Sequence, residues 1–417
     1  MSLIAVVLGL SPAPAQAASL QQVRGFGSNP GNLQMFQYVP DSLPSGAPLV
    51  VALHGCTQSA DDYYSHSGWP KYADMYGFAL VFPQTTSSNN ANSCFNWCQS
   101  SDYTRGQGEA LSIKQMVDYA KSHYGSNPGR VYITGLSGGG AMTSVMLADY
   151  PDVFAGGAID SGIPAGCATD LSSGLTCEYG AVDKTPQQWG DAVRSASGTW
   201  GGPWPHVAIW QGTADRTVHP ANATEERDQW TNIWGISQTP SSTTNLPGGT
   251  TQAVYDDAGG KPAVETFTVS GMTHGLAVSP GSGTDQCGST GAYYLNYICS
   301  SHWTAKFWGL DASGTGDLPA PADLAVTGTP EDHGDGPPPV PVPRWTGDRF
   351  HSSLRCGVRP GGARRTSTVG RAEPRVQAAT GRRGRDRWGR GESPSRRTGP
   401  SGALGPRDAT RHLGRKR

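Results

Sequence analysis

Residues 131–142 read Val131-Tyr132-Ile133-Thr134-Gly135-Leu136-Ser137-Gly138-Gly139-Gly140-Ala141-Met142. A β-branched run enters a G-x-S-x-G pattern here, and a helical pattern follows it. Glycines are needed in such a pattern because a sharp strand-to-helix turn strains the serine backbone and packs its neighbours tightly. The stretch therefore predicts a strand, a turn that exposes the Ser137 hydroxyl at the carboxyl end of a sheet, and a helix behind it.

Short apolar runs and longer helical patterns alternate on both sides of this stretch. Several of the runs are almost continuously apolar, as in parallel strands that are covered on both faces. The alternation predicts one α/β domain, with a mainly parallel sheet and helices on both faces. Strands are expected at 33–39, 48–53, 78–82, 131–134, 154–159, 206–210 and 264–269, and helices at 59–76, 108–124, 139–149, 221–234 and 292–308.

Two segments contain no such pattern and are predicted to be long loops, 161–205 and 236–260. Loops of this length usually serve as lids or binding walls. The first of them is therefore expected to border the functional site.

A serine nucleophile needs a base, and the base needs a carboxylate that orients it. In G-x-S-x-G hydrolases the acid and then the histidine follow the serine, each in a loop after a strand. The run 206–210 leads through a glycine turn to Asp215, and the run 264–269 leads to His274. We predict Ser137 as the nucleophile, His274 as the general base and acid, and Asp215 as the orienting carboxylate.

Three other residues compete for these roles. Asp160 also ends a predicted strand and is an alternative acid. His219 lies four residues after Asp215 and is expected to be a surface or loop residue. His302 lies in a helical pattern with apolar neighbours, where a core histidine is the simpler interpretation.

The loop after the run 48–53 is the expected source of a second oxyanion donor. Its residues are His54-Gly55-Cys56-Thr57-Gln58. The backbone N–H of Thr57 or Cys56, together with that of Gly138, is predicted to stabilise the oxyanion. Loss of one such donor typically slows an enzyme about 100- to 1000-fold.

Four side chains are predicted to contact the substrate. His54 lies in the same strand-end loop as the oxyanion donors. Trp97, Trp200 and Trp204 lie in segments rich in glycine, proline or polar residues, and are expected to offer a stacking face to a sugar or an aromatic acyl group.

The N-terminus and the cysteines both indicate export. An apolar core followed by Ala15-Gln16-Ala17 predicts a signal peptide that is cleaved after Ala17. Seven of the eight cysteines precede residue 344, and disulfides persist mainly in oxidising compartments. The protein is therefore expected to be extracellular.

Local spacing pairs Cys167 with Cys177 and Cys287 with Cys299, and Cys56 with Cys94 is a third choice, which leaves Cys98 without a partner. A metal site is not expected, because Cys94 and Cys98 lack a second pair of ligands at zinc-site spacing.

The net charge of −1 hides two parts of opposite charge. Residues 1–343 carry a net charge of −16 and residues 344–417 a net charge of +15. The basic part consists of Arg, Gly, Pro and Ser with few apolar residues, so it cannot bury enough surface to fold. The predicted divisions are a leader at 1–17, a catalytic domain at 18–310, a Gly/Pro/Asp-rich linker at 311–343 and a disordered tail at 344–417, for which out-of-frame readthrough is one explanation.

Four motifs together resemble those of secreted esterases of the polyhydroxybutyrate-depolymerase-like group, which includes the acetyl xylan and feruloyl esterases of carbohydrate esterase family one. The motifs are residues 53–62, 94–97, 102–109 and 135–142. The resemblance covers roughly residues 20–310. It implies an α/β-hydrolase fold, ester hydrolysis without a metal or other cofactor, and a triad of Ser137, Asp215 and His274.

The resemblance also carries structural expectations. It favours the Cys56–Cys94 disulfide. It further implies that Asp102, Arg105 and Glu109 form a structural ion-pair network and take no part in catalysis.

The predicted function is that of a secreted, monomeric serine carboxylesterase that removes acetyl or feruloyl groups from xylan. An alternative substrate for the same triad is a polyhydroxyalkanoate. An alternative of another class is an inactive secreted protein that binds a carbohydrate, or a polyanion through its basic tail. This alternative would leave an intact triad unexplained. No nucleic acid partner is expected, and no membrane partner, since no run of about 18 apolar residues occurs.

Overall fold

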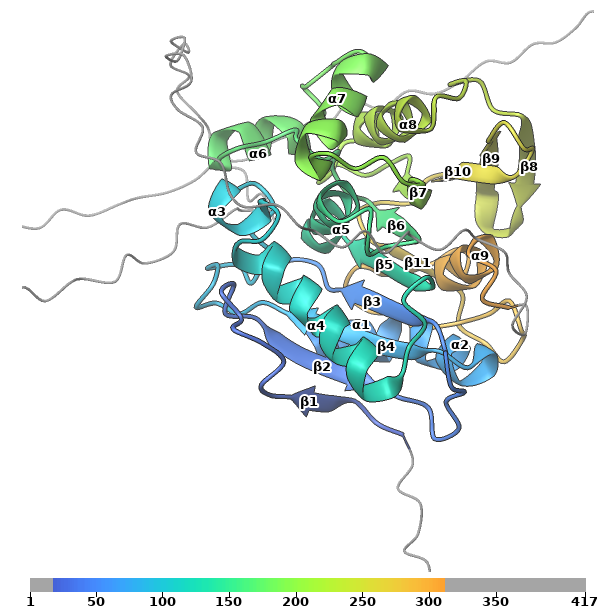
Figure 1. Ribbon diagram of the computed structural model, residues 1–417. Coiled ribbons are helices and arrows are strands. Elements are labelled where there is room, and N and C mark those ends of the chain that lie inside the picture. Colours follow the sequence, from blue (N-terminus) through green and yellow to red (C-terminus); the bar gives the residue numbers. More distant parts are fainter. Residues whose placement is uncertain (1–17, 312–417) are drawn as a thin grey trace, which may run out of the picture. The chain divides into compact units, whose positions relative to one another are not determined.

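The computed structural model describes residues 18–311 (Figure 1). The predicted leader, the basic tail and all but the first residue of the predicted linker lie outside this range.

A ten-stranded sheet forms the centre of the described part, in the order β1-β2-β4-β3-β5-β6-β7-β10-β9-β8. The six inner strands from β4 to β10 run parallel, while β1, β2, β9 and β8 extend the two edges in antiparallel fashion. The predicted mainly parallel sheet is confirmed. Its strands are β1 (Gln21–Val23), β2 (Gln34–Tyr38), β3 (Leu49–Leu53), β4 (Ala79–Gln84), β5 (Val131–Leu136), β6 (Gly156–Asp160), β7 (His206–Gly212), β8 (Ser242–Leu246), β9 (Thr250–Asp256) and β10 (Pro262–Val269).

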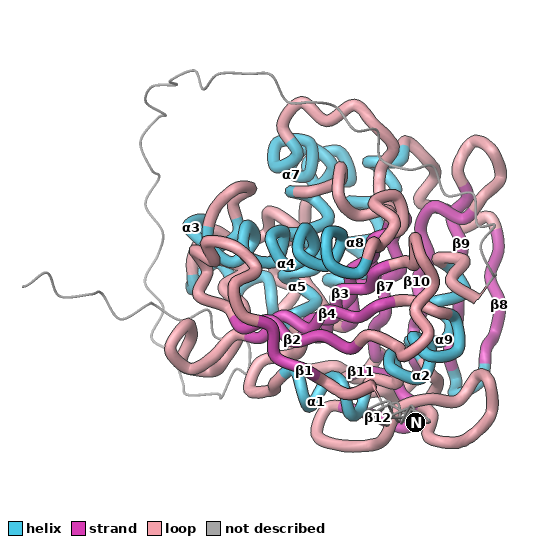
Figure 2. The backbone as a smooth tube through the Cα atoms, turned by 60° about the horizontal axis from the view of Figure 1, so that its bottom comes forward, coloured by secondary structure: helices cyan, strands magenta, loops and turns pink. Residues whose placement is uncertain are grey.

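Helices cover both faces of the sheet, as predicted (Figure 2). One apolar core contains residues of α4 (Gly108–Tyr124), α5 (Gly138–Asp149), α7 (Pro186–Ser197) and α8 (Ala221–Trp234). The other contains residues of α1 (Ala60–His66), α2 (Trp69–Tyr76) and α9 (Ser300–Phe307). Within residues 18–311, no helix is long and apolar enough to cross a membrane. The described residues therefore form one α/β domain in which a mainly parallel sheet lies between two layers of helices, as the α/β-hydrolase expectation requires.

Two predicted helices differ from those observed. The segment 59–76 contains two helices, because Gly68 adopts a φ of 83° and breaks the chain between α1 and α2. The segment 292–308 begins with the strand β12 (Tyr294–Asn296), which pairs with β11 (Leu276–Val278), and only its second half is the helix α9.

The two predicted long loops were wrong. Segment 161–205 folds into α6 (Leu171–Glu178) and α7, and each helix begins with a capping box in which a side chain and a backbone N–H bond reciprocally. Segment 236–260 forms the edge hairpin of β8 and β9, joined by the short 3₁₀ turn η1 (Pro247–Gly249).

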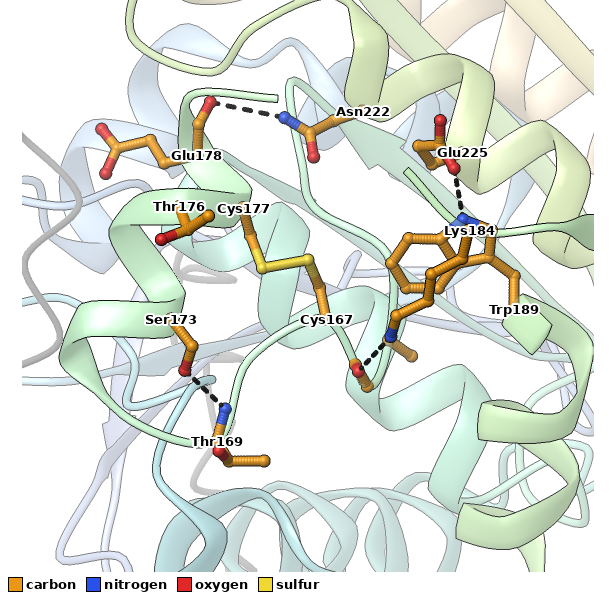
Figure 3. The surroundings of a disulfide bond; sticks show 12 residues. Cys167, Thr169, Ser173, Thr176, Cys177, Glu178, Lys184, Trp189, Asn222 and Glu225 are labelled. Atoms are coloured by element: carbon orange, nitrogen blue, oxygen red, sulfur yellow. Dashed lines mark hydrogen bonds between the residues drawn. A yellow bond between two sulfur atoms is a disulfide. The ribbon is translucent and has the colours of Figure 1, made fainter. Parts of the chain in front are cut away.

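Between pairs of described residues, three disulfides hold loops to this framework. They are Cys56–Cys94, Cys167–Cys177 and Cys287–Cys299, so all three predicted pairs are confirmed. Figure 3 shows that Cys167–Cys177 ties the end of α6 to the segment in front of it. Cys98, which had no predicted partner, is buried and disulfide-bonded as well.

Main chain packs directly on main chain where β5 turns into α5. A Cβ atom on Gly139 would lie 2.5 Å from the carbonyl oxygen of His54 and 2.6 Å from that of Leu53. A Cβ atom on Gly135 would lie 2.4 Å from the carbonyl oxygen of Gly139. The start of α5 therefore touches the end of β3, and this contact requires glycine.

We expect Gly139→Ala to lower the free energy of unfolding by about 1–3 kcal/mol or more, because the new methyl group meets backbone that cannot move aside. Urea unfolding of the purified protein measures this change. Gly201→Ala is the matched control, since no atom lies within 4 Å of a Cβ atom there. Equal stability of the two variants would contradict the close contact.

Candidate active site

Ser137 lies at the turn between β5 and α5. Its φ of 60° and ψ of −119° place a non-glycine residue in a strained conformation, as the G-x-S-x-G pattern predicts. Its N–H donates to the carbonyl oxygen of Asp160 at 2.9 Å. The side chain is held at the carboxyl end of the sheet, with 4% of the residue exposed.

His274 and Asp215 reach Ser137 from two neighbouring strands. Asp215 follows β7 and His274 follows β10, and these strands run parallel and adjacent. The Nε2 atom of His274 lies 2.8 Å from Oγ of Ser137, and its Nδ1 atom lies 2.8 Å from Oδ2 of Asp215. The structure thus brings the three predicted residues into one hydrogen-bonded chain.

Backbone bonds fix the two loops that carry the acid and the histidine. The N–H groups of Thr213 and Ala214 donate to the carbonyl oxygens of Val269 and Met272, both at 3.0 Å. Asp215 is held further by the N–H groups of Thr217 at 2.8 Å and Val218 at 2.9 Å, both on Oδ1. Oδ2 is thereby left facing His274.

The sequence missed one residue that supports Asp215. The side-chain amide of Gln211, a buried residue of β7, donates to Oδ2 of Asp215 at 3.2 Å and to the carbonyl oxygen of Val218 at 3.2 Å. The acid therefore has both of its oxygens bonded before a substrate arrives. Gln211 stands four residues before Asp215, a separation that carries no recognisable motif.

This arrangement has the chemical properties of an acyl-transfer site. A neutral imidazole that donates Nδ1–H to a carboxylate presents Nε2 as an acceptor for the serine proton. Proton transfer to His274 converts the Ser137 hydroxyl into a nucleophile.

The alternative residues lie elsewhere. The carboxyl of Asp160 accepts a hydrogen bond from the hydroxyl of Thr134 at 3.1 Å and does not bond His274. Burial raises the pKa of Asp160 to about 8. His219 is exposed on the chain before α8 and bonds Ala221, and His302 packs against the ring of Tyr72.

One of the three predicted oxyanion donors, Thr57, is wrong. The N–H of Thr57 donates to the carbonyl oxygen of Asn92 at 2.7 Å, so it is not available to a substrate. Cys56 lines the hollow at Ser137. Gly138 is the first residue of α5, where a backbone N–H has no acceptor within the helix. The amides of Cys56 and Gly138 are therefore the candidate pair.

The prediction that His54 contacts the substrate is wrong, because the side chain is fully buried. Its Nδ1 bonds the carbonyl oxygen of Gly55 at 2.7 Å, and its Nε2 accepts from the N–H of Thr85 at 3.3 Å. Burial lowers the pKa of His54 to about 4, so the ring is neutral. Since C=O and N–H point in opposite directions across a trans peptide, His54 orients the N–H of Cys56 by holding the Gly55 carbonyl.

The three predicted tryptophans do not line the hollow at Ser137. Trp97 is 4% exposed and packs in the core beside Gly174 of α6. Trp204 is half-buried against the same core, and the ring of Trp200 lies over Gly202. Of the three indoles, only that of Trp97 is buried, while those of Trp200 and Trp204 are half-buried away from the lining of this hollow.

The hollow above Ser137 is small, about 210 Å³ of space with its open side included. Tyr293 forms an aromatic wall of this hollow, and its ring meets that of His274 edge to face at 5.9 Å between centroids. The sequence gives no sign of this role for Tyr293, because the segment around it has a helical pattern. The residues that line the hollow are Gly55, Cys56, Gln58, Leu136, Ser137, His274 and Tyr293.

Contacts within the expected ion-pair network are well defined in the described residues. Arg105 pairs with Asp152 at 2.7 Å. Asp102 and Glu109 accept hydrogen bonds from the side-chain amide of Asn96, whose backbone N–H also donates to Glu109 at 2.7 Å. In the part of the chain that the structure describes, no group of three His, Cys, Asp or Glu side chains could hold a metal ion.

Comparison with known proteins places these features in context. The family model described as "Esterase PHB depolymerase" matches residues 35–251, a range that contains Ser137 and Asp215 and ends before His274. Poly(3-hydroxyalkanoate) depolymerase C of Paucimonas lemoignei is 50% identical over 309 residues, 74% of each chain. Feruloyl esterase B of Talaromyces stipitatus is 38% identical over 66% of this chain and 77% of its own.

A solved structure agrees with the fold. The acetyl xylan esterase from Aspergillus awamori superposes with a TM-score of 0.60 and 28% identity, over 70% of this chain and 99% of its own. The curated acetylxylan esterase of Coprinopsis cinerea is 39% identical over 66% of this chain and 73% of its own.

Substitution by asparagine should affect activity differently at the two buried carboxyls, Asp215 and Asp160. Asp215→Asn is expected to lower kcat about 10⁴-fold, because the amide favours the wrong imidazole tautomer. Asp160→Asn is expected to keep activity at pH 7 within a few-fold, because Asp160 is neutral there. Steady-state kinetics on nitrophenyl acetate compares them, and a large loss in Asp160→Asn would reassign the acid.

The pH dependence of the free energy of unfolding tests the protonation state of Asp160 independently. The unfolded carboxyl ionises near pH 4 while the folded one stays protonated to about pH 8. Wild-type stability therefore falls as the pH rises through this range, and Asn removes this contribution. Urea unfolding should show a larger gain for Asp160→Asn at pH 8 than at pH 5.

Proposed function

Because the chain belongs to the family of PHB depolymerase esterases, we propose that Ser137, His274 and Asp215 hydrolyse the acyl esters of an extracellular polymer. The protein is a serine esterase of the group that comprises polyhydroxyalkanoate depolymerases and acetylxylan and feruloyl esterases. The observation that carries the proposal is the continuous hydrogen-bonded chain from Ser137 through His274 to Asp215.

The reaction proceeds in two halves. His274 takes the proton of Ser137 as the hydroxyl oxygen attacks the ester carbonyl, and the N–H groups of Cys56 and Gly138 stabilise the resulting oxyanion. His274 then gives the proton to the leaving alcohol, and the acyl group remains on Ser137. Water then enters, gives a proton to His274 and attacks the acyl carbon. The bond between this carbon and Oγ of Ser137 breaks, the acid leaves, and His274 returns the proton to Oγ, which restores the enzyme.

The first candidate substrate is an acetylated or feruloylated plant cell-wall polysaccharide such as xylan. Its support comes from the feruloyl and acetylxylan esterases among the relatives and from the solved acetyl xylan esterase. The small hollow above Ser137 suits a short acyl group such as acetyl.

The second candidate substrate is a polyhydroxyalkanoate. The 50% identity with poly(3-hydroxyalkanoate) depolymerase C of Paucimonas lemoignei favours it. The chemistry at Ser137 is the same, since the leaving alcohol is then the hydroxyl end of the polyester.

The chain is further proposed to act outside the cell as a monomer. The proposed divisions are a leader at 1–17, a catalytic domain at 18–310, a linker at 311–343 and a basic tail at 344–417. Three buried or half-buried disulfides support an oxidising environment. N-terminal sequencing of the exported protein should begin at Ala18, and an intact Met1 on the exported chain would contradict the leader.

Ser137→Ala should lower kcat on nitrophenyl acetate about 10⁶-fold, as loss of a triad serine does elsewhere. Equal turnover by wild type and variant would end the esterase proposal and favour a binding protein. The same pair of proteins should then be tested on acetylated xylan, methyl ferulate and polyhydroxybutyrate granules. A preference of tenfold or more in kcat/KM, about 1.4 kcal/mol, would identify the substrate class.

A further inference from the structure

Tyr293 adopts a backbone conformation that its side chain does not favour. Its φ is 67°, the left-handed region that L-residues other than Asn and Asp rarely enter. Glycine would relieve the strain, yet the position carries a large aromatic ring. Strained residues of this kind cluster where a side chain must be held at a site.

The backbone on both sides of Tyr293 is anchored. Its carbonyl oxygen accepts a hydrogen bond from the N–H of Leu276 at 2.8 Å, and Leu276 lies two residues after His274. The next residue, Tyr294, stacks on His66 at 4.8 Å between ring centroids and begins β12. The Cys287–Cys299 disulfide closes the loop that contains them. The ring of Tyr293 is therefore held in place by its surroundings.

The ring itself remains accessible. Tyr293 is 38% exposed, whereas its neighbour Tyr294 is 2% exposed. It lines the hollow that contains Ser137 and His274, and its ring lies edge to face against that of His274. An accessible aromatic face at the reacting atoms is available to a substrate.

Because His274 donates a proton to the leaving alcohol, its position indicates which half of the ester lies next to Tyr293. The leaving oxygen must come within hydrogen-bond reach of Nε2 of His274 to receive its proton. The first carbons of the alcohol then lie next to the imidazole and the ring beside it. The carbonyl oxygen points instead toward the amides of Cys56 and Gly138.

We propose that Tyr293 is the specificity residue for the alcohol half of the ester, and that its ring packs against a pyranose whose acyl group is removed. This inference rests on the proposed serine esterase function. It assigns the sugar ring, with its flat C–H face, as the alcohol that Tyr293 recognises.

A set of esters separates the two halves of the substrate. Ethyl acetate and ethyl butyrate share a small alcohol and differ in the acyl group, while acetylated methyl xylopyranoside shares the acetyl group and carries a sugar. The informative quantity is kcat/KM, because it reports acylation, the half-reaction in which the alcohol leaves. All acetyl esters then form the same acyl-enzyme.

Tyr293→Asn removes the ring while keeping a residue that tolerates a positive φ. We expect it to lower kcat/KM for the xylopyranoside about 10- to 30-fold, the range of a lost stacking contact. The two ethyl esters should lose less than threefold. Tyr293→Phe should retain the wild-type preference, because the ring remains.

Tyr179→Asn is the matched control, since Tyr179 is 51% exposed and does not line the hollow. Titration of reactive Ser137 with a fluorophosphonate corrects each rate for misfolded protein. Equal losses on all three esters would show that Tyr293 only positions His274, and no loss on any would show that it does not meet the substrate. Either result overturns the inference, whereas the proposed esterase function stands as long as Ser137→Ala abolishes turnover.

Discussion

The contact between the start of α5 and the end of β3 determines where the rest of the site lies. Gly139 meets the carbonyl oxygens of Leu53 and His54 without an intervening side chain. Because of this approach, the loop after β3 and the turn after β5 face each other across a single hollow. The candidate oxyanion donors, the amides of Cys56 and Gly138, belong to these two segments. The strain at Ser137, with its φ of 60°, is a consequence of the same turn.

The acid and the base come from the other half of the sheet, and the strand order explains the choice between two carboxyls. Asp160 ends β6, the strand beside β5, yet its side chain turns into the core and bonds Thr134. Asp215 follows the next strand, β7, and lies beside the loop that follows β10. The backbone bonds between these two loops place His274 between Asp215 and Ser137. The acid therefore follows the strand that neighbours β10, after which the histidine lies, and not the strand that neighbours β5.

The sequence predicted those features that depend on local chemistry. The strained turn at Ser137 and the disulfides of short spacing, Cys167–Cys177 and Cys287–Cys299, are encoded within a few residues. The capping boxes that start α6 and α7 are also encoded within a few residues, but they lie in a segment whose glycines and prolines indicate a loop. Other features depend on residues that are distant in the sequence. The N–H of Thr57 donates to the carbonyl oxygen of Asn92, and Trp97 is buried beneath α6. The position of the Tyr293 ring depends on a positive φ angle, which the residue type does not predict.

The ends of the sheet bear on how the protein behaves at high local concentration. A sheet edge with free backbone donors invites another chain to add a strand, and soluble proteins shorten or block such edges. Here β1 has three residues, and β8 has five, exposed over most of their length and flanked by Pro240 and Pro247. Proline offers no N–H, so the pairing surface of β8 ends at both sides. Molecules at high local concentration would thus resist edge-to-edge pairing of their sheets.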